Sequence, residues 1–413
     1  MKTIVEAQQI ILEHTKKLTA ETTPLTESLG RVLSEDVFSN RNHPPYDISA
    51  MDGYAVRIED VTEPTKDDPT VLKIIDDIVA GGEPKCAVTS GAASRIMTGA
   101  PMPEGADTVI RVEDTDCNSE NVKIFAPYKK GANVRYLGEN LRTDDKVLTD
   151  GTDIGPGELG ILSMVKKAEV PVYRRPRIAI LSTGDELEAL DEPFNDRKIP
   201  DANSYTVMAE LKAIGADVTL LGIARDSEAE LKAKLKEGLG FDALIVSGGV
   251  SVGHHDFVRP TLKSLGIEMR FWRVALRPGH PFAFGTGKDG LLVFALPGNP
   301  VSSMVCCQQF IVPSVRKMLG ADRLFRTTVT ATLTEDIKDR LGRIHFMRSH
   351  LEKTEDGFSV RLTGSQGSGI LMSMVEASCM IIMPAENDKL PAGSTVAVQL
   401  LGPSGFQSEP GFK

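Results

Sequence analysis

Short apolar runs alternate with helix-like segments between residues 177 and 303 of the chain. The runs RIAILS, TLLGIA, ALIVS and VFAL each break into a loop of small, polar or charged residues. Segments such as SYTVMAELKAIG and SEAELKAKLKEGL, which have helical character, separate these runs. Strands that alternate with helices are typical of right-handed βαβ units, in which helices cover a parallel sheet. The pattern therefore predicts a three-layer α/β domain with a parallel-rich sheet over residues 171–325.

The pattern is different on either side of this domain. Residues 41–140 are rich in Gly, Pro, Asp and Thr and contain short alternating runs, which indicates a β-rich lobe of strands and turns. Residues 1–40 and 141–170 contain helix-like segments, and we expect these to pack together as a small helical domain into which the lobe is inserted. Residues 326–413 consist of short β-type runs and predict a C-terminal all-β domain. The fold class is thus a multidomain α/β plus β arrangement.

The composition excludes several classes of protein. A chain of 413 residues is too long for one compact core, and its 41% hydrophobic and 25% charged content is ordinary for a soluble globular protein. The net charge of -10 argues against non-specific nucleic-acid binding. No run approaches the ~20 apolar residues of a membrane helix, and the N-terminus lacks a secretory signal. The five cysteines form no CxxC pair, which indicates reduced thiols and predicts a cytoplasmic protein.

Acidic residues follow three of the predicted strands, where open α/β sheets bind their ligands. Asp185 and Glu186 follow RIAILST after a single glycine, Asp226 follows the next strand, and Asp256 ends the loop GGVSVGHHD. Such carboxylates suit magnesium binding or proton transfer, although helix capping and solvation are the alternatives for each one alone. Gly248 and Gly249 allow a ligand to approach the backbone, but the loop is not a GxxxxGK[ST] phosphate loop.

Two further loops of the α/β domain indicate anion binding. In LPGNPVSS, two prolines fix the turn that leads into a helix, and we expect the first amides of that helix, at residues 301–303, to be free for an anion. A rigid strand-to-helix turn is the alternative. The segment WRVALRPGHPFAFG supplies Arg273, Arg277 and His280, and arginine binds oxyanions through paired hydrogen bonds.

The predicted β-rich lobe also carries elaborate turns. NHPPYDISAMDGYAV contains Asp47 and Asp52, MTGAPMP contains Thr98, and NVRYLGENLR contains Arg135 and Asn140. Long ordered loops are disproportionately functional, so these residues are candidates to face the α/β site.

The motifs taken together resemble the MoeA / gephyrin E-domain family, the molybdopterin molybdenumtransferases. The matching segments, in the family's order, are PPYDISAMDGYAV, IMTGAPMPEGADTVI, GEN, LSTGDEL, SGGVSVGHHDF, RPGHPFAFG, LPGNPVSS and TGSQGS. The resemblance implies that the α/β domain binds molybdopterin, that the C-terminal domain is a β-barrel, and that two chains form an elongated homodimer. The site would then lie in a cleft between the α/β domain and the partner's β-rich lobe. The implied activity inserts molybdate into adenylyl-molybdopterin, cleaves the adenylyl bond and releases molybdenum cofactor and AMP, with a divalent cation, usually Mg²⁺.

The resemblance also assigns roles to residues at matching positions. The catalytic set is Asp52, Thr98, Glu186, Asp226 and Asp256, of which the last three would hold the metal ion. The substrate-binding set is Arg135, Asn140, Thr183, Gly184, Asp185, Ser247, Gly248, Gly249, Ser251, Arg273, Arg277, His280, Pro297, Gly298, Asn299, Pro300 and Ser368. This chain departs from the family pattern at Asn140, where Asp is frequent, and at Arg273, Arg277 and His280, where Lys is frequent.

Three other functions share parts of this pattern. Molybdopterin adenylyltransferases have similar SGGxS and LPGNP loops but lack the β-rich lobe and the barrel. A paralogue that prefers tungstate would have the same sequence features, because the two oxyanions are nearly isosteric. A scaffold role, as in receptor anchoring by gephyrin, is disfavoured because no long linker is visible. The implied partners are a second copy of the chain, the adenylyltransferase and cofactor-accepting enzymes, but neither nucleic acid nor membrane.

Overall fold

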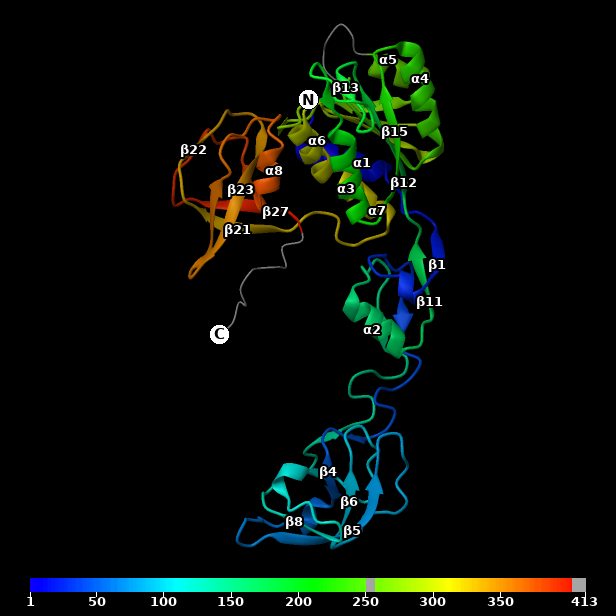
Figure 1. The fold of residues 1–413 in the computed structure, drawn as a ribbon, viewed down its shortest axis with the longest axis vertical. Coiled ribbons are helices and arrows are strands. Elements are labelled where there is room, and N and C mark those ends of the chain that lie inside the picture. The colour runs from blue at the N-terminus through cyan, green and yellow to red at the C-terminus, as the bar shows by residue number, and fades with distance from the viewer. Residues whose placement is uncertain (250–256, 403–413) are drawn as a thin grey trace. The chain divides into compact units, whose positions relative to one another are not determined.

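A computed structural model describes residues 1–249 and 257–402 of the chain. The chain divides into two compact units, which are described separately below (Figure 1). Unit 1 comprises Met1–Glu35, Asp150–Pro156 and Glu169–Lys413, and unit 2 comprises Asp36–Thr149 and Gly157–Ala168. Among the described residues, no helix is long and apolar enough to cross a membrane.

A six-stranded sheet forms the centre of unit 1, in the order β15-β12-β16-β20-β19-β17. The first four strands pair in parallel, as the βαβ pattern predicts, and the two remaining pairings, of β20 with β19 and of β19 with β17, are antiparallel. The predicted parallel-rich sheet is therefore confirmed, with an antiparallel extension at one edge. The strands are β12 (Arg177–Thr183), β15 (Asp217–Ala224), β16 (Ala243–Ser247), β17 (Glu268–Trp272), β19 (Ala283–Thr286) and β20 (Leu292–Leu296).

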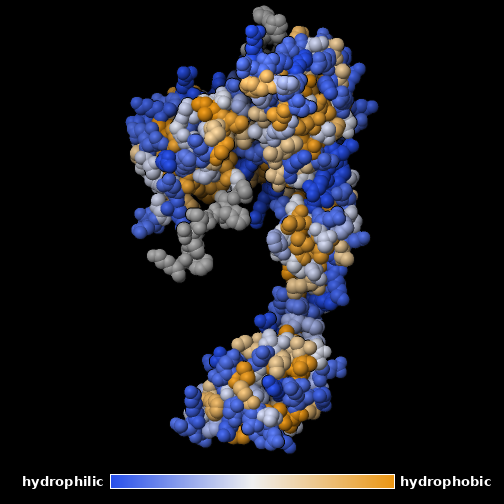
Figure 2. All heavy atoms as spheres, in the orientation of Figure 1, coloured by the Kyte–Doolittle hydropathy of each residue, from blue (hydrophilic) through white to orange (hydrophobic). Residues whose placement is uncertain are grey.

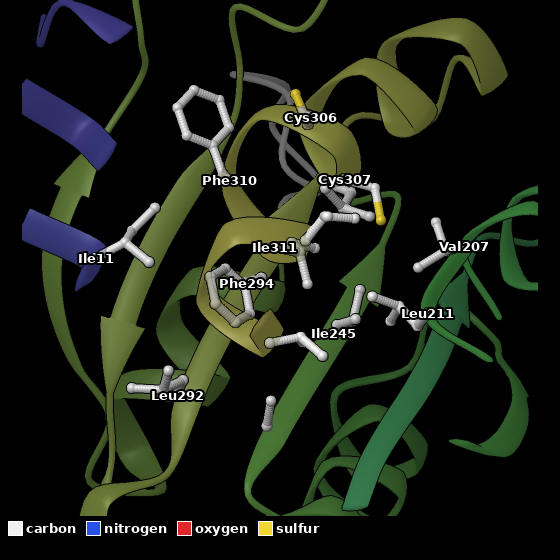
Figure 3. Close-up of a cluster of buried hydrophobic side chains, with 14 of the residues drawn as sticks. Ile11, Val207, Leu211, Ile245, Leu292, Phe294, Cys306, Cys307, Phe310 and Ile311 are labelled. Atoms are coloured by element: carbon white, nitrogen blue, oxygen red, sulfur yellow. The ribbon is translucent and has the colours of Figure 1, made fainter. Parts of the chain in front are cut away.

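Helices cover both faces of this sheet and make it the middle of three layers. On one face, side chains such as Val207, Ile245, Phe294 and Phe310 form the larger core cluster (Figure 3). On the other face, Leu231 and its neighbours pack against the sheet, and mainly hydrophilic residues cover the surface where α4 lies (Figure 2). The helices are α1 (Ile4–His14), α3 (Asn203–Ala213), α4 (Glu228–Glu237), α5 (Val258–Ser264), α6 (Pro300–Cys306) and α7 (Val312–Met318), with a π-helical segment η6 (Cys307–Ile311) between α6 and α7.

The N-terminal helix α1 belongs to the core of the α/β domain. Thr3 caps it, because the Thr3 hydroxyl accepts from the amide of Glu6 while the Glu6 carboxylate accepts from the amide of Thr3. Its apolar side chains, including Ile4 and Ile11, join the larger core cluster, and α1 contacts η6 and α7. The sequence pattern predicts that these side chains pack on the helix-like segment near residue 160. The sheet-covering helices cover them instead, since α1 runs beside α7.

The C-terminal part of unit 1 is a closed barrel, as the family resemblance implies. Its strands follow the order β23-β24-β21-β27-β25, and β25 pairs again with β23 to close the ring. Strand β18 (Leu276–Arg277) of the α/β domain adds to β23 in parallel and joins the two domains. The strands are β21 (Thr328–Leu333), β23 (Ile344–Thr354), β24 (Gly357–Leu362), β25 (Cys379–Met383) and β27 (Thr395–Leu400), accompanied by α8 (Met372–Glu376), β22 (Ile337–Lys338) and β26 (Lys389–Leu390). Unit 1 also contains the strand pairs β1 (Ala20–Pro24) with β11 (Glu169–Tyr173) and β13 (Leu187–Glu188) with β14 (Ile199–Pro200).

Unit 2 is built on a five-stranded sheet in the order β7-β4-β6-β5-β8. Gly53 lies where β4 and β7 approach closely, and a Cβ atom there would lie 1.9 Å from the carbonyl oxygen of Ile110. Tyr54, Leu72 and Val122 belong to one of its cores. The strands are β4 (Gly53–Val56), β5 (Thr70–Ile78), β6 (Ala92–Ile96), β7 (Thr108–Arg111) and β8 (Asn121–Ile124), with the shorter β2 (Val37–Phe38), β3 (Ile48–Ser49), β9 (Val134–Arg135) and β10 (Lys146–Leu148) and the helix α2 (Pro156–Met164).

Candidate functional site

The candidate residues of the α/β domain gather at the carboxyl ends of its parallel strands. Thr183 ends β12, Ser247 ends the neighbouring β16, and the Thr183 hydroxyl donates to the Ser247 carbonyl at 3.5 Å. Gly248 follows with a φ of 92°, and a Cβ atom on it would lie 2.5 Å from the Thr183 carbonyl oxygen. A side chain does not fit there, so the backbone of this loop passes directly over the strand end.

Several hydrogen bonds tie the acidic loops after β12 and β15 together, among them one between the two acidic residues Asp226 and Asp185. The amide of Asp226 donates to a carboxylate oxygen of Asp185 at 3.1 Å. Gly184, with a φ of 143°, lets the Glu186 carboxylate lie over the backbone, because a Cβ atom on Gly184 would be 2.3 Å from Glu186 Oε2. The structure therefore brings the first two acidic loops together, while Asp256 and Ser251 lie outside the described residues.

A cavity of about 570 Å³ opens at this edge of the sheet. Its lining includes Glu186, the Gly248–Gly249 backbone and all four residues of the predicted turn, Pro297, Gly298, Asn299 and Pro300. Glycine and proline together make up about half of this lining, beside a few polar and apolar side chains, so its walls combine exposed backbone with both kinds of surface.

Asn203 is a residue of this cavity that the sequence reading missed. Its side-chain amide donates to the Ser247 hydroxyl and to the Gly298 carbonyl, both at 2.9 Å, and so bridges two of the strand-end loops. It is the first residue of α3. In the sequence, an Asn just before an apolar periodic segment indicates a helix start and gives no signal of a place in a cavity.

The 297–300 turn does not leave the helix amides free. The amide of Val301 donates to the Ser368 carbonyl at 3.1 Å, and the amide of Ser303 donates to the Asn299 carbonyl at 3.0 Å. The prediction of free amides is therefore wrong at both residues. At Val301 the barrel supplies the acceptor, since Ser368 reaches the turn and its hydroxyl also accepts from Asn299 Nδ2 at 3.0 Å, whereas at Ser303 the acceptor is the N-cap residue Asn299 of the same helix.

A second cavity, of about 330 Å³, lies between the α/β domain and the barrel and shares Pro281 and Asn299 with the first. We call it the oxyanion cavity, because its lining includes Arg277, His280, Arg343, His345 and Ser368. Arg343 and His345 were missed in the sequence, where they stand in a β-type run far from the strand-end loops.

A buried carboxylate holds two residues of the oxyanion cavity. Asp339 accepts from Arg277 Nη1 through one oxygen, and its other oxygen lies 2.7 Å from His345 Nδ1. Burial lowers the pKa of His345 below its ordinary value despite the Asp339 carboxylate, and the guanidinium groups of Arg277 and Arg348 lower it further. His280 makes a separate contact, with its Nδ1 2.9 Å from the Val274 carbonyl.

Arg273 is placed differently from Arg277. Its side chain is exposed and lines neither cavity. Its backbone has a φ of 82°, its amide donates to the Phe282 carbonyl, and its carbonyl accepts from the amide of Lys2. A direct role for Arg273 in substrate binding stays a prediction.

In unit 2, Asp52 and Thr98 form one group at the surface. Asp52 Oδ1 accepts from the Thr98 amide at 2.7 Å and from the Thr98 hydroxyl at 2.8 Å. These two hydrogen bonds, the backbone one more than the hydroxyl one, hold the pKa of Asp52 below its ordinary value. Arg135 and Asn140 are also exposed. Asp47 instead ties the lobe together, since it accepts from the amide of Leu137 at 2.7 Å.

Two of the three predicted metal ligands, Glu186 and Asp226, lie among the described residues. Among residues 1–249 and 257–402, no three His, Cys, Asp or Glu side chains converge as a metal site requires. Glu186 and Asp226 supply carboxylate oxygens, the donors that Mg²⁺ prefers, and their loops are tied to each other through Asp185. The chemistry of this partial donor set fits a hard divalent cation.

Three families of known proteins match successive parts of the chain. The MoeA N-terminal region (domain I and II) matches residues 2–165, a probable molybdopterin binding domain matches residues 179–317, and the MoeA C-terminal region (domain IV) matches residues 330–401.

Full-length relatives carry a common name. A molybdopterin molybdenumtransferase of Haemophilus influenzae is 35% identical over 404 residues, which cover 97% of this chain and 98% of that protein. A protein of the same name from Nostoc is 33% identical over 413 residues, which cover 96% and 93% of the two chains. The crystal structure of a molybdopterin biosynthesis moeA protein from Pyrococcus horikoshii OT3 is similar with a TM-score of 0.83 and 28% sequence identity, over 97% of this chain and 100% of that one.

Proposed function

Because this chain belongs to the MoeA family of molybdopterin molybdenumtransferases, we propose that it inserts molybdate into adenylyl-molybdopterin. The adenylyl bond is cleaved in this reaction, and molybdenum cofactor and AMP are released. The chain is an enzyme of molybdenum cofactor biosynthesis, and this function is favoured over an adenylyltransferase because the homology extends over nearly the whole chain.

The observation that carries the proposal is the pair of adjoining cavities that share Asn299 and Pro281. The larger one is lined by the Gly248–Gly249 backbone and by polar side chains such as Asn203 and Asn299, which suit a pterin with its phosphates. The smaller one has arginine, histidine and hydroxyl groups, which suit a tetrahedral oxyanion. Two substrates that must react with each other would thus be bound in adjoining cavities.

In the larger cavity, the strand-end loops would bind adenylyl-molybdopterin. The Gly248–Gly249 backbone, together with Thr183 and Ser247 at the strand ends, would approach the phosphates, and Asn203 would keep the loops in register. Gly184, Asp185 and the 297–300 turn complete this proposed substrate-binding set. Glu186, Asp226 and Asp256 would hold Mg²⁺, which supplies neutralisation of phosphate charge when bound.

In the oxyanion cavity, molybdate would be bound by Arg277 and Ser368, with His280 and Arg343 beside them. Asp339 holds the Arg277 guanidinium in place before the substrate arrives. A preorganised donor loses less conformational entropy on binding than a free surface arginine.

The β-rich lobe would contribute the remaining groups. We propose that Asp52, held by Thr98, assists cleavage of the adenylyl bond, with Arg135 and Asn140 as substrate contacts. We also propose a homodimer in which the lobe of one chain serves the cavities of the other.

The test is a reconstituted reaction with purified protein. Adenylyl-molybdopterin, molybdate and Mg²⁺ should yield AMP, together with cofactor that activates an apo-molybdoenzyme. A parallel reaction with molybdopterin and ATP measures adenylyltransferase activity, and replacement of molybdate by tungstate measures metal preference. Product only in the molybdopterin and ATP reaction would overturn the proposal.

A further inference from the structure

Asp339 connects two residues of the oxyanion cavity that come from different domains. Arg277 lies on β18 of the α/β domain, and His345 lies on the barrel strand β23, next to it in the same sheet. The Asp339 side chain is 5% exposed and that of His345 is 2% exposed, so water does not compete effectively for their hydrogen bond. The contact between Asp339 and His345 is therefore shielded from solvent, while the half-exposed Arg277 reaches Asp339 from the cavity side.

The Asp339 contact determines which nitrogen of His345 carries the proton. An ionised carboxylate only accepts hydrogen bonds, so the ring nitrogen beside it, Nδ1, must be the donor. Nε2 is then the nitrogen left for a ligand in the cavity, and in the neutral ring it is an acceptor. The oxygens of molybdate are acceptors as well. A neutral His345 and a bound oxyanion therefore repel each other, whereas a second proton on the ring turns Nε2 into a donor.

Burial of His345 and the positive charges around it favour the neutral ring in the absence of an anion. Burial lowers the pKa of His345, and the positive charges of Arg277 and Arg348 act in the same direction, while Asp339 opposes them. Arg343 and His280 also line the cavity. Arg343 adds a positive charge, and His280 adds one in its protonated form. A dianion in the cavity offsets these positive charges and favours the protonated ring.

We propose that Asp339 is a positioning residue that couples oxyanion binding to proton uptake: it holds Arg277 and His345, and His345 takes one proton from solvent when molybdate enters. The proton binds at Nε2, and no other bond forms or breaks. This inference rests on the proposed function, which places molybdate in the same cavity.

The test is calorimetric titration of the full-length protein with sodium molybdate. Titrations at one pH in buffers of different ionisation enthalpy give the number of protons taken up for each molybdate bound. Near pH 7 the wild-type chain should take up close to one proton for each molybdate that it binds. By reciprocal linkage, its affinity should fall as the pH rises above the pKa of free His345, by up to about tenfold per pH unit.

Two variants separate this coupling from general electrostatics. His345→Gln keeps a side chain that donates and accepts hydrogen bonds but cannot take up a proton, and Asp339→Asn removes the negative charge that supports the protonated ring. Both should bind molybdate with no proton uptake and with an affinity that does not change between pH 6 and 8. His350→Gln is the matched control, because His350 lies on the same strand but does not line the cavity, and it should behave as wild type.

Each result bears on a different conclusion. If the wild-type chain binds molybdate without proton uptake, the coupling is refuted while the proposed function stands, and this measurement needs no variant. If proton uptake is lost in His280→Gln but remains in His345→Gln, the proton binds to His280, and this result also overturns the inference. Absence of any molybdate binding contradicts the oxyanion cavity itself.

Discussion

Thr98 binds Asp52 through both its amide and its hydroxyl, and both hydrogen bonds end on the same carboxylate oxygen, Oδ1. The second oxygen of Asp52, on an exposed side chain, is left for a substrate or a water molecule. If Asp52 acts in the transition state, Asp52→Ala should lower kcat by roughly 10²–10³, the usual effect of removing one such contact. AMP release under single-turnover conditions measures it. A rate within about twofold of wild type would remove Asp52 from the mechanism. Asp47→Ala is the control for folding of the lobe, since Asp47 makes a structural contact with Leu137.

The same pair predicts a pH effect. The Thr98 hydrogen bonds keep the pKa of Asp52 below its ordinary value, so the carboxylate stays ionised until the pH falls through that lowered pKa. Thr98→Val removes the hydroxyl and keeps the amide, which is the larger cause. The pKa should therefore rise part of the way to its ordinary value, and the loss of kcat in acid should move to higher pH. A profile of kcat against pH that is identical for the two proteins contradicts a role for ionised Asp52.

Substitution at Gly248 should disrupt the strand-end loops. A Cβ atom there would lie 2.5 Å from the Thr183 carbonyl oxygen, and the φ of 92° adds strain. Gly266→Ala is a matched control, because its φ of 82° is similar but nothing lies within 4 Å of the new Cβ. Gly266→Ala should cost about 1–2 kcal/mol of the free energy of unfolding. Gly248→Ala should cost more and should also weaken ADP binding, which calorimetry measures. Equal costs for the two variants would show that the close approach to Thr183 has no energetic weight.

Asn203 predicts a stability effect in the same region. Asn203→Ala removes two hydrogen bonds, to the Ser247 hydroxyl and to the Gly298 carbonyl. Each is worth about 0.5–1.5 kcal/mol, so urea denaturation should show a loss of roughly 1–3 kcal/mol. The Michaelis constant for adenylyl-molybdopterin should rise as well, because two loops of the cavity lose their bridge. Asn195→Ala offers a comparison, since the Asn195 side-chain oxygen accepts from the amide of nearby Arg197, and this substitution should have a small effect on both quantities.

The proposed homodimer predicts complementation between inactive chains. Asp52→Ala lies in unit 2 and Glu186→Gln in unit 1, so a mixed dimer would keep one site in which both residues are intact. With random mixing, half of the dimers are mixed and each has one functional site of two, which restores about a quarter of wild-type activity. Activity that does not rise on mixing, at a ratio where mass spectrometry detects mixed dimers, contradicts sites shared between chains.

The sequence pattern predicted those parts of the fold that depend on local order. The βαβ alternation gave the parallel strands of the central sheet and placed Thr183, Glu186 and Ser247 at one edge, because consecutive parallel strands end on the same side. The barrel followed from the family resemblance and is confirmed. The boundaries of a separate helical domain stay a prediction.

The missed residues depend on contacts between distant segments. Arg273 and Arg277 are close in sequence, but the left-handed backbone at Arg273 turns the chain, and only Arg277 lines a cavity. His345 joins Arg277 because β18 pairs with β23, a pairing that no periodicity in either segment indicates. Likewise, the helix amide of Val301 looked free because its acceptor, Ser368, stands more than sixty residues later in the chain.

The hydrogen bond from Val301 to Ser368 has a consequence for how the barrel should be regarded. A helix that starts at a strand end usually offers its first amides to an anion. Here the barrel places a carbonyl oxygen on that amide, and so takes the position of the ligand that a free-standing α/β domain would recruit from solution. The Ser368 carbonyl oxygen thus occupies, as part of the chain itself, the position that an anion would otherwise take. Removal of the barrel would recreate a vacant anion site, and a protein cut before residue 326 should bind phosphate or sulfate where the intact chain does not.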